Sequence, residues 1–390
     1  MKIAQVCPFF YPVEGGVENH VLSISTELLK RGHEVHVLTS ANSRDSKALA
    51  PSERVSNLEV RRFRPLMILG EFGSFWPGVI MELLDGHYDV VHAHSFRHPH
   101  TDLAALSSKI TGSSCILTSH SPFHPGEVRG PLARDLVSAY DHMMAPLTLR
   151  AFDGVISLTT HEARTLVGLG APKDRVTVIP NGVGDEHFEE TVTDAFISHF
   201  GLLGKRVVLY LGRINRTKGI EVLVHSFSLV ATKVADAQLV IAGPATDINE
   251  TTYREDLETL VADLGISGRV TFTGRLSEDD KLAALQACDL LVLPSVYEPF
   301  GIVLLEAAAH GKAVVAARTD GPSSIISHGL NGLLVEPRDV SGLAEAILTL
   351  LNDDDYRERL GKMARQDAER YRWKNITDRV ESLYNRFAPP

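Results

Sequence analysis

The stretch that decides the fold is "KIAQVCPFFYPVEGGVENHVLSISTELLKRGHEVHVLT", residues 2–39. It begins with a short apolar run, passes the adjacent glycines Gly15 and Gly16, and ends in a β-branched run, Glu34–Thr39. Between the glycines and the last run, apolar residues recur at helical spacing over 17–31. A strand, a helix and a second strand in this order predict two parallel strands joined by a crossover helix.

The same alternation continues along most of the chain. In the first half the predicted strands are Lys2–Cys7, Glu34–Thr39, Val90–His94, Cys115–Ser119, Gly154–Leu158 and Val176–Ile179. The pattern restarts at "RVVLYLGR" (206–213), after a stretch rich in Pro, Gly and polar residues at 179–190. We therefore predict an α/β protein with two doubly wound domains, at 1–185 and 186–365, followed by an amphipathic helix over 366–390.

Composition narrows the class of protein. The chain has 390 residues, a formal net charge of −10 and only three cysteines, none in a CxxC pair. The acidic balance disfavours nucleic acid as a partner, because proteins that bind polyanions usually present a basic face. Scattered cysteines indicate reduced, buried thiols, and we expect a cytoplasmic protein because neither a signal peptide nor an apolar run of membrane-spanning length is visible.

Two glycine-containing turns are candidate anion sites. In open α/β sheets, ligands bind beyond the carboxyl ends of the strands. Gly15 and Gly16 lie between the first strand and the first helix, where free backbone N–H groups and the helix dipole favour an anion. The motif is neither GxGxxG nor a P-loop, so dinucleotide binding is disfavoured. The alternative is a tight turn that binds nothing.

The loop "GRINRTKG" follows the first strand of the second domain and contains Arg213 and Lys218. Two cations on one loop suit a diphosphate, because arginine gives forked contacts and lysine gives a point charge. The alternative is a solvated basic turn.

A pair of acidic residues occurs in "PSVYEPFGIVLLEAAAHG", residues 294–311. Glu298 precedes a Pro–Phe–Gly turn and Glu306 falls on the helix that follows, so the two carboxylates can address two parts of one ligand. The backbone N–H groups of Gly301, Ile302 and Val303 offer another anion site. A solvated glutamate is the alternative, but the apolar surroundings favour a function.

Histidines are frequent, at 17 in the chain. His120 follows the predicted strand 115–119, where it can donate a hydrogen bond or move a proton. The run "HAHSFRHPH" (92–100) matches no standard zinc spacing, so we predict no metal site there. For any one histidine the alternative is a hydrogen-bonded core residue.

Together these motifs resemble the retaining GT-B glycosyltransferases of family 4, also called glycosyltransferase group 1. The resemblance rests on the opening stretch and on "IPNGV", "YLGRINRTKG", "FTGRL" and "EPFGIVLLEAAAHGKAVVA" with its E-x7-E spacing. It implies two Rossmann-like domains that face each other across a cleft, a nucleotide-sugar site, and a final helix that crosses back to the N-terminal domain. One departure is Ser324, near where the family often has a glutamate.

The resemblance also implies roles for individual residues. Arg213 and Lys218 would bind the donor diphosphate in place of a divalent metal, Glu298 would contact the donor sugar and His120 would face the reacting sugar. These four are the expected catalytic residues. The expected donor-binding residues are Gly15, Gly16, Arg213, Lys218, Arg275, Leu276, Phe300, Gly301, Ile302, Val303 and Glu306, with Glu306 on the ribose and Arg275 and Leu276 near the base.

The expected reaction moves a sugar from a UDP- or GDP-sugar to a hydroxyl acceptor on a glycolipid, a lipid or a polysaccharide precursor. It would proceed with retention and without a metal or cofactor. Two alternatives on the same fold are a nucleotide-sugar 2-epimerase and a nucleotide-sugar-binding protein without catalysis. An NAD-dependent dehydrogenase is disfavoured by the missing GxGxxG.

We expect the acceptor loops in the N-terminal domain, around residues 61–76 and 121–130. Residues 60–80 combine three arginines with an apolar stretch, and the residues concerned are Arg61, Arg62, Arg64, Phe72, Phe75 and Trp76. One hypothesis is peripheral contact with an anionic membrane, on its inner face, that admits a lipid acceptor. The alternative is a basic strand followed by a core helix.

Overall fold

The computed structural model describes the chain except for residues 14, 43–47, 69–73, 121–130, 246–247 and 389–390. The chain forms two compact units. One consists of Met1–Asn181 and Trp373–Pro390, and the other of Gly182–Arg372. The sequence analysis drew its boundaries after residues 185 and 365.

The N-terminal unit is built on an eight-stranded sheet with the order β10-β9-β8-β7-β1-β2-β4-β3. All neighbours are parallel except β3 and β4. The strands are β1 Lys2–Val6, β2 Glu34–Ser40, β3 Ser52–Val55, β4 Leu58–Phe63, β7 Val90–His94, β8 Ser114–Thr118, β9 Gly154–Ser157 and β10 Val176–Val178. A short hairpin, β5 Met67–Ile68 with β6 Ser74–Phe75, is separate.

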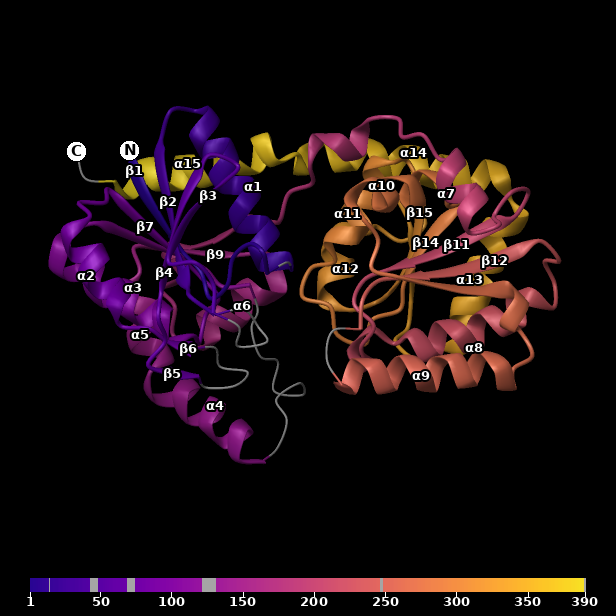
Figure 1. The fold of residues 1–390 in the computed structure, drawn as a ribbon, viewed down its shortest axis with the longest axis horizontal. Helices are drawn as coiled ribbons and strands as arrows, with labels where there is room; N and C mark the ends of the chain where they lie inside the picture. The colour runs from indigo at the N-terminus through magenta and orange to yellow at the C-terminus, as the bar shows by residue number, and fades with distance from the viewer. Residues whose placement is uncertain (14, 43–47, 69–73, 121–130, 246–247, 389–390) are drawn as a thin grey trace. The chain divides into compact units, whose positions relative to one another are not determined.

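Helices cover both faces of this sheet, as Figure 1 shows. They are α1 Gly16–Lys30, α2 Gly78–Asp85, α3 Pro99–Thr111, α4 Pro131–Met143, α5 Ala145–Ala151, α6 Thr160–Gly168 and α15 Trp373–Phe387. Successive residues of β1 serve opposite faces: Ile3 packs with residues of α1 and α15, whereas Ala4 packs with residues of α2 and α3. Because both faces of the sheet are buried, the strand sequences are nearly continuous apolar runs.

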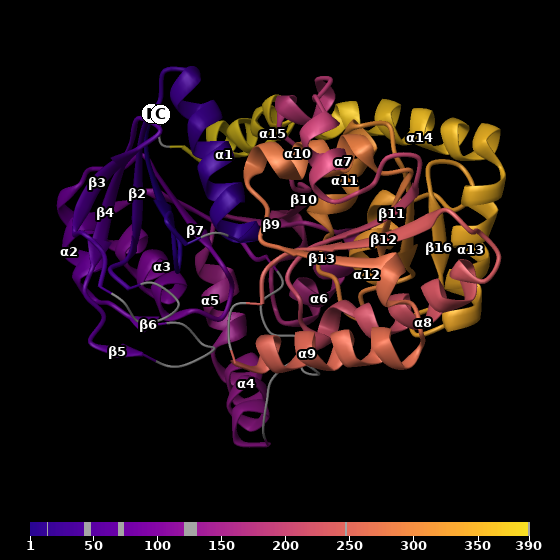
Figure 2. The same cartoon turned by 45° about the vertical axis from the view of Figure 1, so that its right-hand side comes forward.

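The C-terminal unit contains a six-stranded parallel sheet with the order β13-β12-β11-β14-β15-β16. Its strands are β11 Arg206–Leu211, β12 Ala237–Ala242, β13 Val270–Gly274, β14 Leu290–Leu293, β15 Ala313–Ala317 and β16 Leu333–Val335. Its helices are α7 Asp194–His199, α8 Ile220–Ala231, α9 Ile248–Asp263, α10 Glu278–Ala287, α11 Ile302–Ala309, α12 Asp320–Ile325, α13 Val340–Asn352 and α14 Asp354–Ala368. Helices α8 and α9 lie on one face, and α10 and α11 on the other (Figure 2).

These two sheets confirm the predicted α/β fold with two Rossmann-like parts. The helix predicted over 17–31 is α1, and its apolar stripe is buried at Val21, Ile24 and Leu28. Cys7, Cys115 and Cys288 are buried free thiols, as expected.

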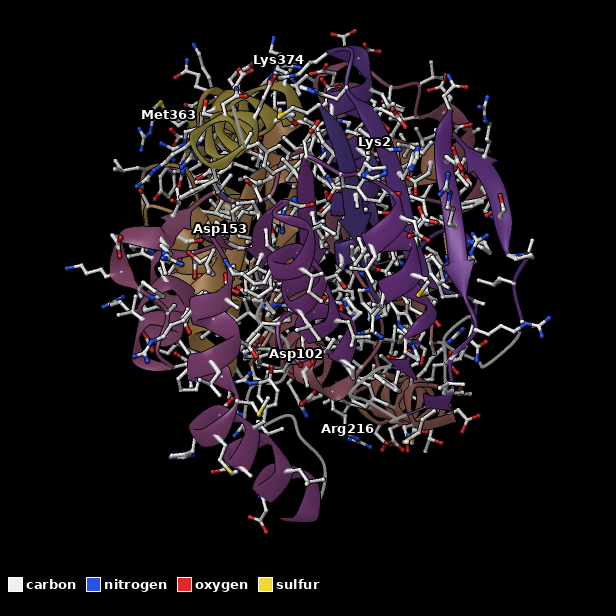
Figure 3. All side chains as sticks on the ribbon, turned by 90° about the vertical axis from the view of Figure 1, so that its left-hand side faces the viewer. Lys2, Asp102, Asp153, Arg216, Met363 and Lys374 are labelled. Carbon is white, nitrogen blue, oxygen red and sulfur yellow. The ribbon has the colours of Figure 1, made fainter. Side chains whose placement is uncertain are left out.

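Aspartates fix the amino ends of the strands in the N-terminal unit. Asp89 accepts a hydrogen bond from the backbone N–H of Lys2 at 2.7 Å, and Asp153 accepts one from Cys115 at 2.9 Å. Lys2 and Asp153 are labelled in Figure 3. Since these anchors occupy the amino edge, the carboxyl edge is left for side chains that bind ligands.

The tail differs from the single helix expected over 366–390. Helix α14 ends at Ala368, a 3-10 turn covers Glu369–Tyr371, and α15 begins at Trp373. The break is Arg372, which has an extended backbone (φ −55°, ψ 139°) and pairs with Val183 in a parallel bridge. Its guanidinium lies 3.6 Å from the ring centre of Phe188. Contacts with residues distant in the sequence therefore stabilise the extended backbone at Arg372.

Helix α15 belongs to the N-terminal unit and packs on α1. Arg31, which directly follows α1, pairs with Asp378 at 2.6 Å and with Glu381 at 2.7 Å. Further in, the hydroxyl of Tyr384 lies 2.6 Å from Nδ1 of His92 on β7. The last helix therefore supports buried polar residues at the centre of the sheet.

Candidate functional site

The loop after β11 holds both cations that the sequence singled out. Lys218 ends a 3-10 turn, Arg216–Lys218, and Gly219 follows it with a left-handed backbone (φ 63°). A Cβ at Gly219 would lie 2.4 Å from the carbonyl oxygen of Pro294, so this close approach requires glycine. The loop is thereby fixed against the carboxyl end of β14.

Glu298 lies in the loop after β14 and meets Lys218. Its Oε2 is 2.8 Å from Nζ of Lys218 and accepts a hydrogen bond from the hydroxyl of Ser295 at 3.2 Å. Glu298 is buried, so its charge requires a partner, and Lys218 supplies one. The structure thus joins two residues that the sequence analysis derived from separate motifs.

The segment that contains Ser324 packs against the backbone of Glu298 and Phe300. Gly321 donates its N–H to the backbone oxygen of Glu298 at 3.2 Å, and a Cβ at Gly321 would lie 2.6 Å from the backbone of Phe300. Ser324 donates its hydroxyl to the backbone oxygen of Gly321 at 2.6 Å. The serine that departs from the family pattern therefore serves local packing of this loop.

Helix α11 begins directly after this loop. Gly301 precedes it with φ 90°, and no side chain caps its first turn. The backbone N–H groups at Ile302 and Val303 therefore remain available to an anion. Phe300, the residue before Gly301, is buried.

Glu306, on α11, forms an ion pair with a residue that the sequence analysis missed. Its Oε1 lies 2.7 Å from Nζ of Lys281 on α10, and Nε2 of His187 is 3.6 Å away. Burial by itself would raise the pKa of the Glu306 carboxyl, but Lys281 and His187 hold that pKa below its usual value. Glu306 is therefore a charged carboxylate, and no sequence spacing links it to Lys281.

The remaining predicted residues of this unit lie at the same edge of the sheet but are not all in contact. Arg213 is half exposed and lies 3.5 Å from Glu250 on α9. Arg275, which is exposed, and Leu276 follow β13. Since β11, β13 and β14 are parallel, their carboxyl ends place cations, carboxylates and free N–H groups on one side of the unit.

In the N-terminal unit, the glycine turn and His120 also follow strand ends. Helix α1 begins at Gly16, and Gly15 is extended (φ 174°) without a side-chain cap. Residues 121–130, part of the expected acceptor region, lie outside the described residues. His120 follows β8 and has a left-handed backbone (φ 54°).

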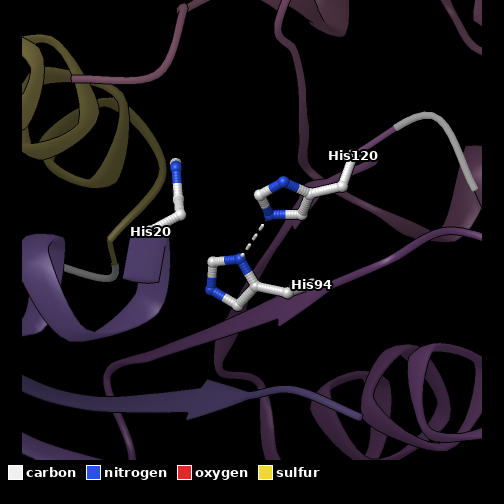
Figure 4. A group of neighbouring side chains, drawn as sticks. All are labelled: His20, His94 and His120. Atoms are coloured by element: carbon white, nitrogen blue, oxygen red, sulfur yellow. Dashed lines mark hydrogen bonds between the residues drawn. The ribbon is translucent and has the colours of Figure 1, made fainter. Parts of the chain in front are cut away.

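His120, which is half-buried, belongs to a cluster of three histidines, with the buried His20 of α1 and the buried His94 at the end of β7 (Figure 4). Nδ1 of His94 lies 3.1 Å from Nε2 of His120, and the rings of His20 and His120 meet edge to face. Burial lowers the pKa of His20 to about 4 and the pKa of the other two well below the usual value, so all three are neutral near pH 7. The sequence analysis singled out His120, considered His94 only within the run 92–100, for which it predicted no metal site, and did not consider His20.

Several residues of the basic stretch at 60–80 are buried or paired within the N-terminal unit. Arg61 pairs with Glu59 at 2.6 Å, Arg62 is buried, and Trp76 is a core residue stacked on Phe63. Phe72 lies outside the described residues. In the part of the chain that the structure describes, no helix combines the length and the hydropathy that a bilayer span requires.

Comparison with known proteins matches both units to families. Residues 14–187 match the family described as Glycosyltransferase Family 4, and residues 195–367 match Glycosyl transferases group 1. The chain is 30% identical to a D-inositol 3-phosphate glycosyltransferase of Xylanimonas cellulosilytica, over 95% of this chain and 91% of that protein. It is 29% identical to a phosphatidyl-myo-inositol mannosyltransferase of Mycobacterium leprae, over 100% and 97%.

Among solved structures, Anabaena Alr3699/HepE in complex with UDP and glucose superposes with a TM-score of 0.80 at 22% identity. The match covers 99% of this chain and 100% of that one. It shows that the chain has the same fold.

Proposed function

The chain belongs to the group 1, or family 4, glycosyltransferases, and we propose that it moves a sugar from a UDP- or GDP-sugar to a hydroxyl acceptor with retention. The observation that carries the proposal is the pair of the half-buried Lys218 and the buried Glu298 beside the uncapped start of α11. This arrangement offers positive charge and free N–H groups for a diphosphate, next to a carboxylate for sugar hydroxyls.

The leaving group determines what the protein must supply. The bond between the sugar's anomeric carbon and the donor phosphate oxygen breaks, and the leaving nucleoside diphosphate takes the bonding electron pair. We assign Arg213, Lys218 and the N–H groups of Ile302 and Val303 to this developing charge. In this scheme the two cations take the place of a divalent metal at the diphosphate.

Retention follows if the acceptor attacks from the face that the diphosphate leaves. The new bond joins the acceptor oxygen to the anomeric carbon, and the acceptor proton passes to the departing phosphate oxygen. No carboxylate is required as a covalent nucleophile. The family resemblance assigns His120 to the reacting sugar, and Gly15 and Gly16 to the diphosphate and the acceptor.

The pair of Lys218 and Glu298 has a specific consequence for donor binding. Without donor, Nζ of Lys218 neutralises Glu298. When a diphosphate binds, it competes for Nζ, and the carboxylate of Glu298 becomes available to sugar hydroxyls. Lys218 then contacts the diphosphate and Glu298 contacts the sugar, so diphosphate binding is coupled to sugar recognition.

The ribose and base have their own candidates. Oε1 of Glu306 is held by Lys281, and this fixed carboxylate suits the paired hydroxyls of a ribose. Arg275 and Leu276 are assigned to the base. The structural relative bound to UDP supports a nucleotide-sugar donor without choosing uracil over guanine.

A lipid-borne acceptor at an anionic membrane is favoured by one surface feature. Leu66, Met67 and Ile68 are 77%, 55% and 53% exposed, next to the exposed Arg64. Exposed apolar residues beside a cation suit the interface of an anionic bilayer. The phosphatidyl-myo-inositol mannosyltransferase relative acts, by its name, on a lipid, which supports this acceptor class.

The decisive experiment screens UDP- and GDP-sugars by thermal shift and then follows transfer to phosphatidylinositol and to inositol phosphate. One donor class should stabilise the protein, and the product should keep the donor's anomeric configuration by NMR. A changed sugar without acceptor would instead indicate an epimerase. Donor binding without any product, over a broad acceptor panel, would favour the non-catalytic alternative.

A further inference from the structure

We propose that His20, His94 and His120 of the N-terminal unit form a binding site for a transition-metal ion of the zinc class. His20 lies on α1, His94 is the last residue of β7, and His120 lies in the loop after β8. A ring nitrogen of each lies within 4.8 Å of the others. Figure 4 shows the three side chains grouped together. Three imidazoles suit zinc, cobalt, nickel and copper.

The spacing of the nitrogens is close to what an ion requires. Zinc–nitrogen bonds of about 2.0–2.1 Å in a tetrahedron separate two ligand nitrogens by roughly 3.3 Å. Nδ1 of His94 and Nε2 of His120 are already 3.1 Å apart. A small movement of the His20 ring then completes a three-nitrogen site whose fourth position is left to an exogenous ligand.

Carboxamide oxygens orient two of the three rings. Nδ1 of His20 is 2.7 Å from Oδ1 of Asn181, and Nε2 of His94 is 2.7 Å from Oε1 of Gln5. Because a carboxamide oxygen only accepts, each of these ring nitrogens carries the proton. The lone pairs are therefore on Nε2 of His20 and Nδ1 of His94. Metal-bound histidines commonly show such a hydrogen bond on the other ring nitrogen.

Gln5 is held at both ends of its carboxamide. Its side-chain nitrogen donates to the hydroxyl of Tyr384 on α15 at 3.3 Å, and its oxygen lies 2.7 Å from Nε2 of His94. The neighbouring His92 is not a ligand, because Tyr384 and Thr118 engage its two ring nitrogens at 2.6 and 2.7 Å.

One ring nitrogen of the cluster, Nε2 of His20, lacks a hydrogen-bond partner among the described residues. His20 is 2% exposed, so this nitrogen is buried. A buried polar atom without a partner is unfavourable, because the hydrogen bond to water that it loses on burial is not replaced. A metal ion would satisfy this lone pair together with that of His94.

The site has a consequence for catalysis, and this part rests on the proposed function. An ion bound to His120 withdraws that imidazole from the reacting sugar, so zinc should inhibit transfer. The binding site itself does not depend on the proposed function, because it follows from the geometry of one unit.

The test uses the full chain, freed of metal by a chelator that is then removed. Titration with Zn²⁺ by calorimetry should show a single saturable ion per chain, and Co²⁺ should give the visible absorption of a low-coordinate site. The main variant is His120→Asn, because asparagine tolerates the left-handed backbone at φ 54°. The matched control is His87→Asn, at an exposed position of the same unit with φ 49°.

Asn181→Ala tests the orienting hydrogen bond and should weaken Zn²⁺ affinity about 10–100-fold. His120→Asn should abolish the saturable ion while His87→Asn keeps it, with all variants melting as folded proteins. Absence of saturable binding, or equal binding in His120→Asn and His87→Asn, overturns the site. A metal-free chain that binds Zn²⁺ but transfers no sugar would count against the proposed function and leave the site intact.

Discussion

Nζ of Lys218 lies 2.8 Å from Oε2 of Glu298, although the residues come from loops after two different strands, β11 and β14. The contact exists because those strands are adjacent and parallel, so their carboxyl ends share one edge. This pair is the central element of the proposed donor site.

Removing the cation of this pair should weaken donor binding. Lys218→Met loses a charge-assisted contact to the diphosphate, worth about 1.5–3 kcal/mol, or roughly 10–150-fold in affinity. Isothermal titration with UDP and GDP measures the change. Lys205→Met, at an exposed position of the same unit, is the control. Equal affinity in the wild type and Lys218→Met would contradict the assignment.

Glu298→Gln keeps the shape of the side chain but removes its charge. We expect the rate of transfer to fall about 10²–10³-fold while UDP or GDP binding is retained, because the carboxylate is assigned to the sugar and not to the diphosphate. Initial rates with saturating donor test this. An unchanged rate would remove Glu298 from the catalytic residues.

Gly16 should matter more for transfer than for donor binding. Gly16→Leu places a bulky side chain where the acceptor is expected, so transfer should drop at least about tenfold, while the donor KM changes less than about threefold. Gly168→Leu is a suitable control, because a Cβ at this helical glycine meets nothing within 4 Å. Equal losses in both quantities would indicate that the turn serves the donor alone.

Lys281→Met should destabilise the C-terminal unit in a pH-dependent way. Glu306 would be left as a buried charge without its main partner, at a cost of about 3 kcal/mol near pH 7. Glu278→Gln is the control, since Glu278 is 82% exposed and its 3.7 Å pair with Lys281 should contribute less than about 1 kcal/mol.

The sign of the pH dependence follows from Glu306. In the wild type its pKa is lowered in the folded state, so its stabilising contribution is present above the unfolded pKa of about 4.3 and is lost as pH falls through the folded pKa. In Lys281→Met, burial raises the folded pKa instead. The difference in urea midpoint between wild type and variant should therefore be largest near pH 7 and shrink towards pH 4. A difference that grows on acidification would refute this account.

The exposed strand β5 predicts membrane contact. Ile68→Glu should reduce co-sedimentation with vesicles that contain anionic lipid, because the charge opposes insertion and repels the surface. Met81→Glu, at an exposed position on α2 of the same unit, is the control. Wild-type protein that fails to sediment with anionic vesicles would refute the contact.

The sequence by itself determined the alternation of strands and helices, because burial on both faces of a parallel sheet leaves a local apolar pattern. It also identified the glycine turns, Arg213, Lys218 and the two glutamates, since each lies in the loop after a strand or on the helix that follows. The resemblance added their roles, and the family comparisons support the same class of enzyme.

Only the tertiary structure decided which of these groups meet. Glu306 takes Lys281 as its partner, and His120 takes His94 and His20, from segments whose separation along the chain carries no signal. The break at Arg372 likewise depends on its pairing with Val183. Strand order and helix packing bring such residues together through space, and a local sequence pattern records only what each residue's own strand or helix requires.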